Sequence, residues 1–533
     1  MGGTRREGSR TMEVQAQPQV EVPAGGRDPR RWWVLGVMCL SALVLVVDGM
    51  ALTVAVPAMT ASIGASSQDI QWILDSYVLV FAGLLLTSGG LGDRFGRRRV
   101  MLIGLLLFGA ASLIALFCSH PGEVIGVRVA MGVGGALIMP STLSILITVF
   151  EQDERPKAMA IWGSVSMLGL VGSPVLAGVL IDHFSWRSIF FLNIPVVGLA
   201  LLAGLTLMPE SKGPWRKPDV PGAVLSAVGM VALVWWIIRI PVHGAFQGGS
   251  LASFLVAVAA LAGFVFWENT VAEPMVPLVL FKARNFSGGS ISLALVEIGS
   301  GGLLLVLTQY LQFVHGYSPV KAGLAFTPLA VAALIGNGMG AKLTAKIGFR
   351  FLILAGMLVM AASFALLATV SADTPFAVPA VALGLLGLGA GLAMPAAVGA
   401  LMGTIPPEQA GVGSALNDTI GQAGSALGIA ILGSMLAGGY SRNVPAGAPA
   451  EAKSSIAGAL AAADGNSGLI HQAREAFTTS MSTTFTVSAI GVLVAAALAT
   501  LVMRDKKTDN EETDTEKTDT EKSVADVAPE PAA

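Results

Sequence analysis

The stretch GGLGDRFGRRR, residues 89–99, lies between two long apolar runs and decides the fold. Residues 71–88 before it are almost all apolar, and residues 100–117 after it are again long enough to span a bilayer core of about 30 Å. Four arginines and Asp93 crowd this short turn, whose glycines allow two helix ends to approach closely. Arginines beside membrane helices resist translocation, so the turn is expected to face the cytoplasm. An ordinary cytoplasmic loop explains the arginines, but neither Asp93 nor the glycine spacing.

The composition is that of an integral membrane protein. The chain has 533 residues, of which 54% are hydrophobic and only 12% charged, whereas soluble domains carry about 25% charged residues. Its two cysteines, Cys39 and Cys118, lie in or beside apolar runs, and its five histidines are scattered singly. This pattern predicts neither a disulfide framework nor a metal site.

Apolar segments of about 20 residues recur along the chain and predict about fourteen membrane-spanning helices. The first eight are 33–55, 70–90, 99–118, 122–149, 157–182, 187–208, 220–240 and 250–268. The other six are 287–313, 321–341, 350–371, 376–402, 411–437 and 482–503.

The distribution of lysine and arginine predicts that both termini are cytoplasmic in a multi-pass protein of the plasma or inner membrane. Residues 1–31 are polar, carry no signal peptide and are predicted to form a disordered arm. Residues 504–533 contain a repeated TDTEK and are predicted to form a disordered tail. Of the 32 lysines and arginines, those expected outside are Arg187, Lys321, Arg442, Lys453 and Arg474.

An internal repeat divides the membrane part in two. GVGGALIMP at 132–140 reappears as GLGAGLAMP at 387–395. Parallel repeats place a substrate path between the two halves. The expected fold is an all-α integral membrane protein of two six-helix bundles plus two inserted helices. The N-terminal bundle would cover 32–208, the linker with the inserted helices 209–286, and the C-terminal bundle 287–503. The last contains a long external loop, 438–481, in which a short amphipathic helix around 470–477 is possible.

Five charged residues fall within the predicted spans: Asp48, Asp75, Arg128, Glu297 and Asp418. Such residues usually mark ion or substrate paths. Asp48 and Arg128 lie at matching depth on antiparallel helices, so they could pair and offset the cost of their burial. For Asp75 the alternative is a carboxylate near its helix start, within reach of water. For Asp418 the alternative is an acid in the N-terminal turn of its helix, where the helix dipole stabilises a negative charge.

The turn at 89–99 resembles the loop between helices 2 and 3 of the major facilitator superfamily. The residues that match its G-x-L-a-D-R-x-G-R-[KR] pattern are Gly89, Leu91, Asp93, Arg94, Gly96, Arg97 and Arg98. The resemblance implies a cytoplasmic gate in which Asp93 and the arginines latch the bundles together. A degenerate second copy at 341–350 has Ala345 where Asp93 aligns, so the latch is lopsided.

A second motif, GSVSMLGLVGSPVLAG at 163–178, resembles the antiporter motif that exporters of this superfamily carry on helix 5. The matching residues are Gly169, Gly172, Pro174 and Gly178, and the proline favours a kink. A generic packing seam is the alternative. Further segments, 46–57, 71–79, 186–195 and 414–428, resemble signatures of the fourteen-helix drug:proton antiporter branch.

This resemblance implies proton-coupled efflux of hydrophobic, often cationic drugs or antibiotics by alternating access. The chain has no Gly-Lys-Ser/Thr nucleotide loop, so the proton gradient is expected to drive transport. No enzyme activity, cofactor, metal or nucleic acid is expected, and a monomer in the lipid bilayer would suffice. Asp48, Asp75, Glu297 and Asp418, with Arg128, are the candidates for proton coupling and drug binding. Two alternatives are a dedicated exporter of one natural product and a sensor or scaffold without transport.

Overall fold

A computed structural model describes residues 30–151, 154–212, 219–272, 274–405, 410–445, 447–463 and 466–503. Every regular element in these ranges is a helix. Twelve helices are long and apolar enough to cross a membrane, or thirteen if the bent helix α2 counts as one span. The chain is therefore a multi-pass, all-helical membrane protein, as predicted. Of the two predicted disordered arms, all but residues 30 and 31 lie outside the described residues.

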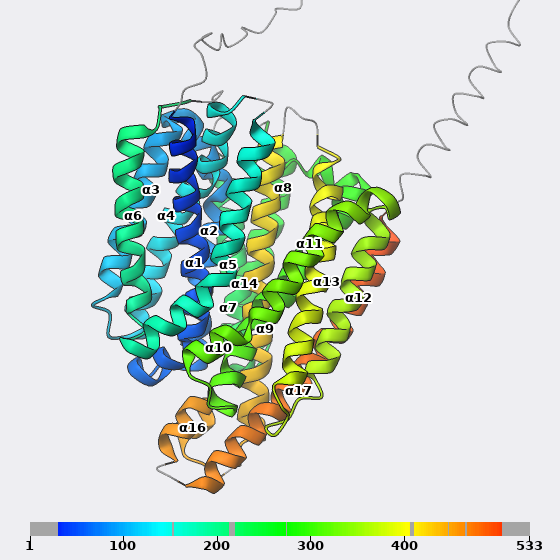
Figure 1. Ribbon diagram of the computed structural model, residues 1–533. Coiled ribbons are helices and arrows are strands. Elements are labelled where there is room, and N and C mark those ends of the chain that lie inside the picture. The colour runs from blue at the N-terminus through cyan, green and yellow to red at the C-terminus, as the bar shows by residue number, and fades with distance from the viewer. Residues whose placement is uncertain are drawn as a thin grey trace, which may run out of the picture.

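The first half of the chain forms one bundle of six helices, followed by an inserted pair (Figure 1). The bundle contains α1 (Arg31–Ile63), α2 (Ser67–Phe95), α3 (Arg97–Ala115), α4 (Pro121–Val149), α5 (Arg155–His183) and α6 (Ser188–Leu207). The inserted pair is α7 (Val220–His243) and α8 (Gly248–Thr270), and the 3-10 helix η1 (Leu278–Lys282) follows it.

The second bundle lies beside the first and is tilted against it (Figure 1). It contains α9 (Arg284–Gln309), the short π-helix η2 (Tyr310–Val314), α10 (Pro319–Ala325), α11 (Thr327–Ile347), α12 (Phe349–Leu367), α13 (Ala377–Met402), α14 (Ala410–Asn443) and α17 (Ser467–Val502). Two short helices, α15 (Ala450–Ser454) and α16 (Ile456–Ala462), connect α14 to α17. We call the end at which α1 begins and α17 ends the inner end, and the opposite end the outer end.

Fourteen helical stretches lie where the sequence predicts them, with two local corrections. The helix predicted over 321–341 is broken at Phe326 into α10 and α11, because Pro328 begins a new helix there. The predicted loop 438–481 is mostly helical, because α14 continues to Asn443 and α17 already begins at Ser467. The possible helix around 470–477 is part of α17. Hydropathy missed these extensions since they carry polar residues beyond the apolar runs.

The internal repeat is visible as two equivalent glycine contacts. A Cβ placed on Gly134 of α4 would lie 2.8 Å from the Gly104 carbonyl of α3. A Cβ on Gly389 of α13 would lie 2.6 Å from the Gly356 carbonyl of α12. Both contacts let two helix backbones touch, which small residues allow in membrane proteins. The two bundles are thus built around the same close helix pair.

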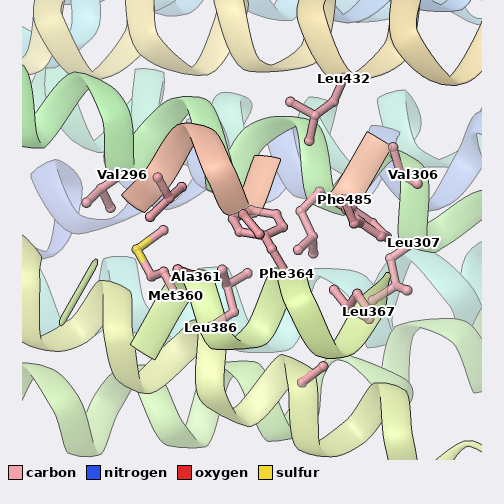
Figure 2. Packing of buried hydrophobic residues seen from close by; sticks show 14 of the residues in the cluster. Val296, Val306, Leu307, Met360, Ala361, Phe364, Leu367, Leu386, Leu432 and Phe485 are labelled. Carbon is pink, nitrogen blue, oxygen red and sulfur yellow. The ribbon is translucent and has the colours of Figure 1, made fainter. Parts of the chain in front are cut away.

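Aromatic and aliphatic side chains fill the rest of the second bundle. Figure 2 shows Phe364 of α12 and Phe485 of α17 at the centre of this packing, with Leu386 and Leu432 reaching toward them from α13 and α14. The rings of Phe364 and Phe485 lie 5.9 Å apart. Such packing holds the helices of the bundle as one body.

The bundles touch closely at the outer end. A Cβ on Gly178 of α5 would lie 2.6 Å from the carbonyl of Pro319, the first residue of α10, and a Cβ on Gly323 of α10 would lie still closer to the Pro174 carbonyl. Gln312 of η2 donates a hydrogen bond to the Val54 carbonyl of α1, and Ser67 donates one to the Ser454 carbonyl of α15. The outer end of the interface is therefore closed by close backbone contacts and by two side-chain hydrogen bonds.

We predict that Gly389→Ala destabilises the second bundle, because its new methyl group would overlap the Gly356 carbonyl. Overpacking of this kind typically costs about 1–3 kcal/mol. Gly384→Ala, on the same helix, is the control, because nothing lies within 4 Å of its Cβ position. Thermal unfolding of the purified proteins in detergent should show a lower midpoint for Gly389→Ala alone. Equal midpoints for both variants would contradict the close contact.

Candidate functional site

An ion pair occupies the interior of the first bundle. Arg128 Nη1 of α4 lies 2.5 Å from Asp48 Oδ2 of α1, and both side chains are almost fully buried. Arg128 also donates to the Ile73 carbonyl of α2, and its guanidinium lies 4.2 Å from the centre of the Tyr77 ring. The structure therefore brings together the two residues whose pairing the sequence suggested. Their role in coupling stays a prediction.

Two polar residues that the sequence analysis did not select complete this cluster. Asn193 of α6 donates from Nδ2 to Asp48 Oδ1 over 3.0 Å and lies 3.3 Å from Ser112 Oγ of α3. Both residues are buried. Asn193 could have been noticed as the one amide within the apolar run of α6. The cluster ties five helices of the first bundle together, and its described contacts all stay within that bundle.

Asp75 has a different environment. It is fully buried, more than two turns into α2, and neither carboxyl oxygen has a hydrogen-bond partner in the described part of the chain. The alternative of a solvated carboxylate near the helix start is therefore wrong. Gln71, one turn earlier, contacts Gly433 of α14, and Leu79, one turn later, packs with residues of α7 and α14. Residues at this spacing share a helix face, so Asp75 faces the junction of both bundles and the inserted pair.

Glu297 and Asp418 lie on α9 and α14, which pack against each other in the second bundle. Glu297 of α9 faces two glycines of α14: its Cγ lies 3.8 Å from the Cβ position of Gly421, and its Cβ 3.0 Å from that of Gly424. Asp418 precedes Gly421 by one turn and accepts a hydrogen bond from Asn417. α14 begins at Ala410, so Asp418 is not a first-turn acid, and that alternative is wrong. Both carboxylates are partly exposed within the described structure.

Asp93 and Arg97 of the turn at 89–99 bond within the first bundle in this conformation. Asp93 forms a 2.8 Å ion pair with Arg97, which also donates to the Ser144 carbonyl of α4. Gly96 has φ +109°, and a side chain there would collide with the Glu210 carboxylate. This carboxylate, which the sequence analysis missed, accepts from the Arg98 N–H at the start of α3. The predicted latch between the bundles is not formed by these contacts and stays a prediction.

The remaining gate residues lie on the same turn. Gly89 packs near Pro140 of α4, and the Arg94 guanidinium lies over the Phe95 ring. α2 bends by 55° between Ser67–Leu85 and Thr87–Phe95, where Ser88, Gly89 and Gly90 weaken the helix.

The glycine motif of α5 serves two contacts. Gly169 faces Leu43 of α1, and Ser173 donates to the Val47 carbonyl of α1 over 2.8 Å. Gly178 faces the other bundle at α10, as described above. Gly172 has open space around it. The motif is therefore a packing seam on one side and an interface between the bundles on the other.

A small, partly open pocket lies between the bundles, beside the contacts that close the outer end. Its lining combines α1, α5, α9 and α11: Met50, Thr53, Val54, Pro174, Leu304, Thr308, Phe326, Leu329 and Ala330. A mostly apolar lining with a few hydroxyl groups suits a hydrophobic small molecule. The site therefore combines an apolar pocket with acids in both bundles.

His315, at the outer end, is not suited to carry protons. Burial lowers its pKa, and the nearby cations Lys321 and Arg474 lower it further. Its Nε2 lies 2.8 Å from the Tyr310 hydroxyl, which donates to the Ser371 carbonyl. This neutral histidine belongs to the framework of the outer end.

Comparison with known proteins identifies the family. Residues 38–429 match the model of the Major Facilitator Superfamily. The chain belongs to this superfamily. It is 32% identical over 498 residues to the "Tetracenomycin C resistance and export protein" of Streptomyces glaucescens, covering 90% of this chain and 92% of that protein. It is 33% identical over 496 residues to the "Multidrug efflux pump LfrA" of Mycolicibacterium smegmatis, covering 90% and 98%.

Among solved structures, a bacterial homologue of the human lysosomal transporter Spinster, in an inward-facing and unoccupied conformation, superposes with a TM-score of 0.65. The sequence identity is 16%, and the alignment covers 90% of this chain and 98% of that one. At this identity the likeness concerns the fold alone. The superfamily resemblance that the turn at 89–99 suggested is thus confirmed, and the chain is a member of a transporter family.

We predict that Asp48→Asn lowers the stability of this superfamily member, because it leaves the Arg128 charge buried without its counter-charge. Removing one partner of a buried ion pair typically costs about 3–5 kcal/mol. The double variant Asp48→Asn/Arg128→Gln removes both charges and should regain most of that loss. Thermal unfolding of wild type, both single variants and the double variant gives the coupling energy. A coupling energy near zero would show that the pair does not stabilise the bundle.

Proposed function

We propose that this protein exports hydrophobic, often cationic drugs or antibiotics in exchange for protons, by alternating access between its two bundles. It would act as a monomer in the plasma or inner membrane, with both termini in the cytoplasm and without a cofactor. The names of the two relatives support drug export, and the apolar lining of the pocket between the bundles is of the kind that such substrates need. Proton coupling rests on the acids.

The observation that supports proton coupling most directly is the burial of Asp75 without a hydrogen-bond partner in the described part of the chain. A carboxylate that is buried without a hydrogen-bond partner is costly in its charged form, and binding a proton removes that charge. Asp75 lies where the two bundles and the inserted pair meet, so its charge state affects how they pack. Glu297 and Asp418, on α9 and α14 of the second bundle, would supply further titrating acids. Asp48 is already neutralised by Arg128 and would act by holding the first bundle rigid or by exchanging partners during transport.

The energetics favour more than one titrating acid. One proton that enters across about 100 mV releases roughly 2.3 kcal/mol, and a one-unit pH difference adds about 1.4 kcal/mol. For a neutral drug this sustains a gradient of a few hundredfold, since about 1.4 kcal/mol corresponds to tenfold. Exchange of one monovalent cation for one proton moves no net charge, so only the pH difference helps. Efficient export of cations therefore requires a second proton and a second acid.

The conformation supports alternating access. The outer end is closed by the glycine contacts of α5 and α10, whereas the described contacts of Asp93, Arg97 and Arg98 at the inner end do not reach the second bundle. We infer that this is the state open to the cytoplasm. In the opposite state the outer contacts would separate, and Asp93 with Arg94, Arg97 and Arg98 would reach the second bundle.

Dye accumulation with and without a protonophore tests the proposal. Cells or vesicles that contain the protein should accumulate less of a cationic dye, and the protonophore should abolish the difference. A dedicated exporter of one natural product would leave the dye unaffected but lower the accumulation of that product. A sensor or scaffold would affect neither.

We predict that Asp48→Asn abolishes export of all substrates, whereas Asp75→Asn and Glu297→Gln impair cationic substrates more than neutral ones. Asp75→Asn and Glu297→Gln each remove one titrating acid. The acid that remains is enough to exchange one proton for a neutral drug, whereas a cationic drug requires two protons. Initial export rates of a cationic and a neutral dye, normalised to the amount of inserted protein, measure this. Equal losses for both dyes in the Asp75 and Glu297 variants would contradict the division of labour.

We predict that Gly178→Val opens the outer end, because its side chain would overlap the backbone of Pro319 and Val320. A cysteine introduced at Met50, in the pocket, should then react several times faster with an impermeant maleimide added from outside, after Cys39 and Cys118 are replaced by alanine. Gly172→Val on the same helix is the control, because its Cβ position has nothing within 4 Å. Unchanged labelling in Gly178→Val would contradict a gate at this contact.

A further inference from the structure

The inserted helices carry two carboxylates whose oxygens converge on one point at the inner end. A Cβ on Gly222 of α7 would touch Asp219 Oδ2 and lie 2.7 Å from Glu268 Oε1 of α8. Glu268 is only 3% exposed. Both of these oxygens are buried, and neither has a hydrogen-bond partner in the part of the chain that the structure describes.

The other oxygen of each carboxylate is fully engaged. Asp219 Oδ1 accepts from the Gly222 N–H over 3.0 Å and from the Trp267 indole over 2.7 Å. Glu268 Oε2 accepts from the Val276 N–H over 2.9 Å. These donors fix the orientation of both carboxyl groups, so the two remaining oxygens cannot turn away from each other without losing hydrogen bonds.

We propose that Asp219 and Glu268 form a proton-binding site, in which one proton is shared between Asp219 Oδ2 and Glu268 Oε1. Two carboxylates that face each other away from water cannot both stay ionised. A single proton between them removes the repulsion and also supplies the missing hydrogen bond of both oxygens. The site is separate from the acids of the two bundles and does not depend on drug export.

Within the described ranges, no cation forms an ion pair with Asp219 or Glu268. Its surroundings on α7, α8 and the following segment are the backbone N–H groups of Gly222 and Val276 and the Trp267 indole. Lys282, the cation of η1, forms no ion pair with either carboxylate within the described ranges. Arg216 and Lys217, which precede Asp219 in the sequence, lie outside the described residues.

The proton would act on a segment that crosses between the bundles. This segment, residues 274–283, is here called the strap. Thr87 of α2 donates to the Met275 sulfur in the strap over 3.9 Å, while the Val276 side chain belongs to the core of the second bundle. Glu268 holds the strap through the Val276 N–H. With the proton bound, the strap is tethered to the inserted pair; when the proton leaves, repulsion between Asp219 and Glu268 loosens the tether.

Infrared spectra of the protein in lipid nanodiscs test the shared proton. Wild type should show a carbonyl band of a protonated carboxyl group that is lost in Glu268→Gln and equally in Asp219→Asn. Each amide supplies an N–H where the proton lies, so both variants should fold. Asp373→Asn, at an exposed site, is the control and should keep the band. A band lost in only one variant shows a single protonated acid and overturns the sharing, and a band lost in neither overturns the site.

Hydrogen–deuterium exchange of the strap provides the second readout. A contact with a purely structural role would not make this exchange depend on the protonation of the pair. In wild type, exchange of the Val276 amide should accelerate about tenfold beyond its intrinsic pH dependence as the infrared band disappears with rising pH. In both amide variants the exchange should show only the intrinsic dependence. A wild-type strap that follows the intrinsic dependence at all pH values would overturn the tether. Neither measurement requires transport, so the failure of this proposal is distinguishable from failure of drug export.

Discussion

A charged side chain inside a membrane-spanning bundle must find its counter-charge within the protein, because the hydrocarbon core supplies none. Arg128 meets this constraint with Asp48, the Ile73 carbonyl and the Tyr77 ring. These contacts come from three other positions on α1 and α2, and Asn193 adds α6. Each of these helices must keep its register for the arginine to stay paired. The pair therefore makes the first bundle a body that moves as a unit, which alternating access requires.

The buried acids fall into two classes by their partners. Asp48 is paired with the Arg128 cation and the Asn193 amide, so adding a proton to Asp48 would break this network. Asp75 has no partner in the described part of the chain, and Asp219 and Glu268 have one oxygen each that lacks one. A bound proton would neutralise the charge of these partnerless carboxylates, as Arg128 compensates the charge of Asp48. Their positions differ in consequence: Asp75 lies at the contact of α2 with α14 and α7, whereas the Asp219–Glu268 pair lies beside the strap that leads into the second bundle.

The sequence predicted those features that depend on local composition. The helix positions follow from apolar runs, the repeat from recurring glycines, and the pairing of Asp48 with Arg128 from their matching depth. Features that depend on tertiary contacts were missed. Nothing near Asn193 in the sequence points to Asp48, and nothing near Glu210 points to Gly96. The extension of α17 to Ser467 escaped detection because its first turns are polar, and the break at Phe326 because both sides of it are apolar. Asp93 shows a third limit, since it pairs with Arg97 in this conformation and its contact with the second bundle stays a prediction.

The two ends of the interface use different interactions, and this difference bears on how a proton could switch the protein. At the outer end, Gly178 and Gly323 bring backbones into contact, so the attraction comes from close packing and changes little with charge. At the inner end, the turn at 89–99 and the strap are held by carboxylates. A proton that binds the Asp219–Glu268 pair therefore changes the free energy of the inner contacts and leaves the outer packing unaltered. Because the bundles move as units, a change at one end shifts the balance at the other. The glycine contacts then contribute a free energy of outer closure that does not change with protonation. The charge-dependent contacts at the inner end add a free energy that does change, and the sum of the two determines the conformation.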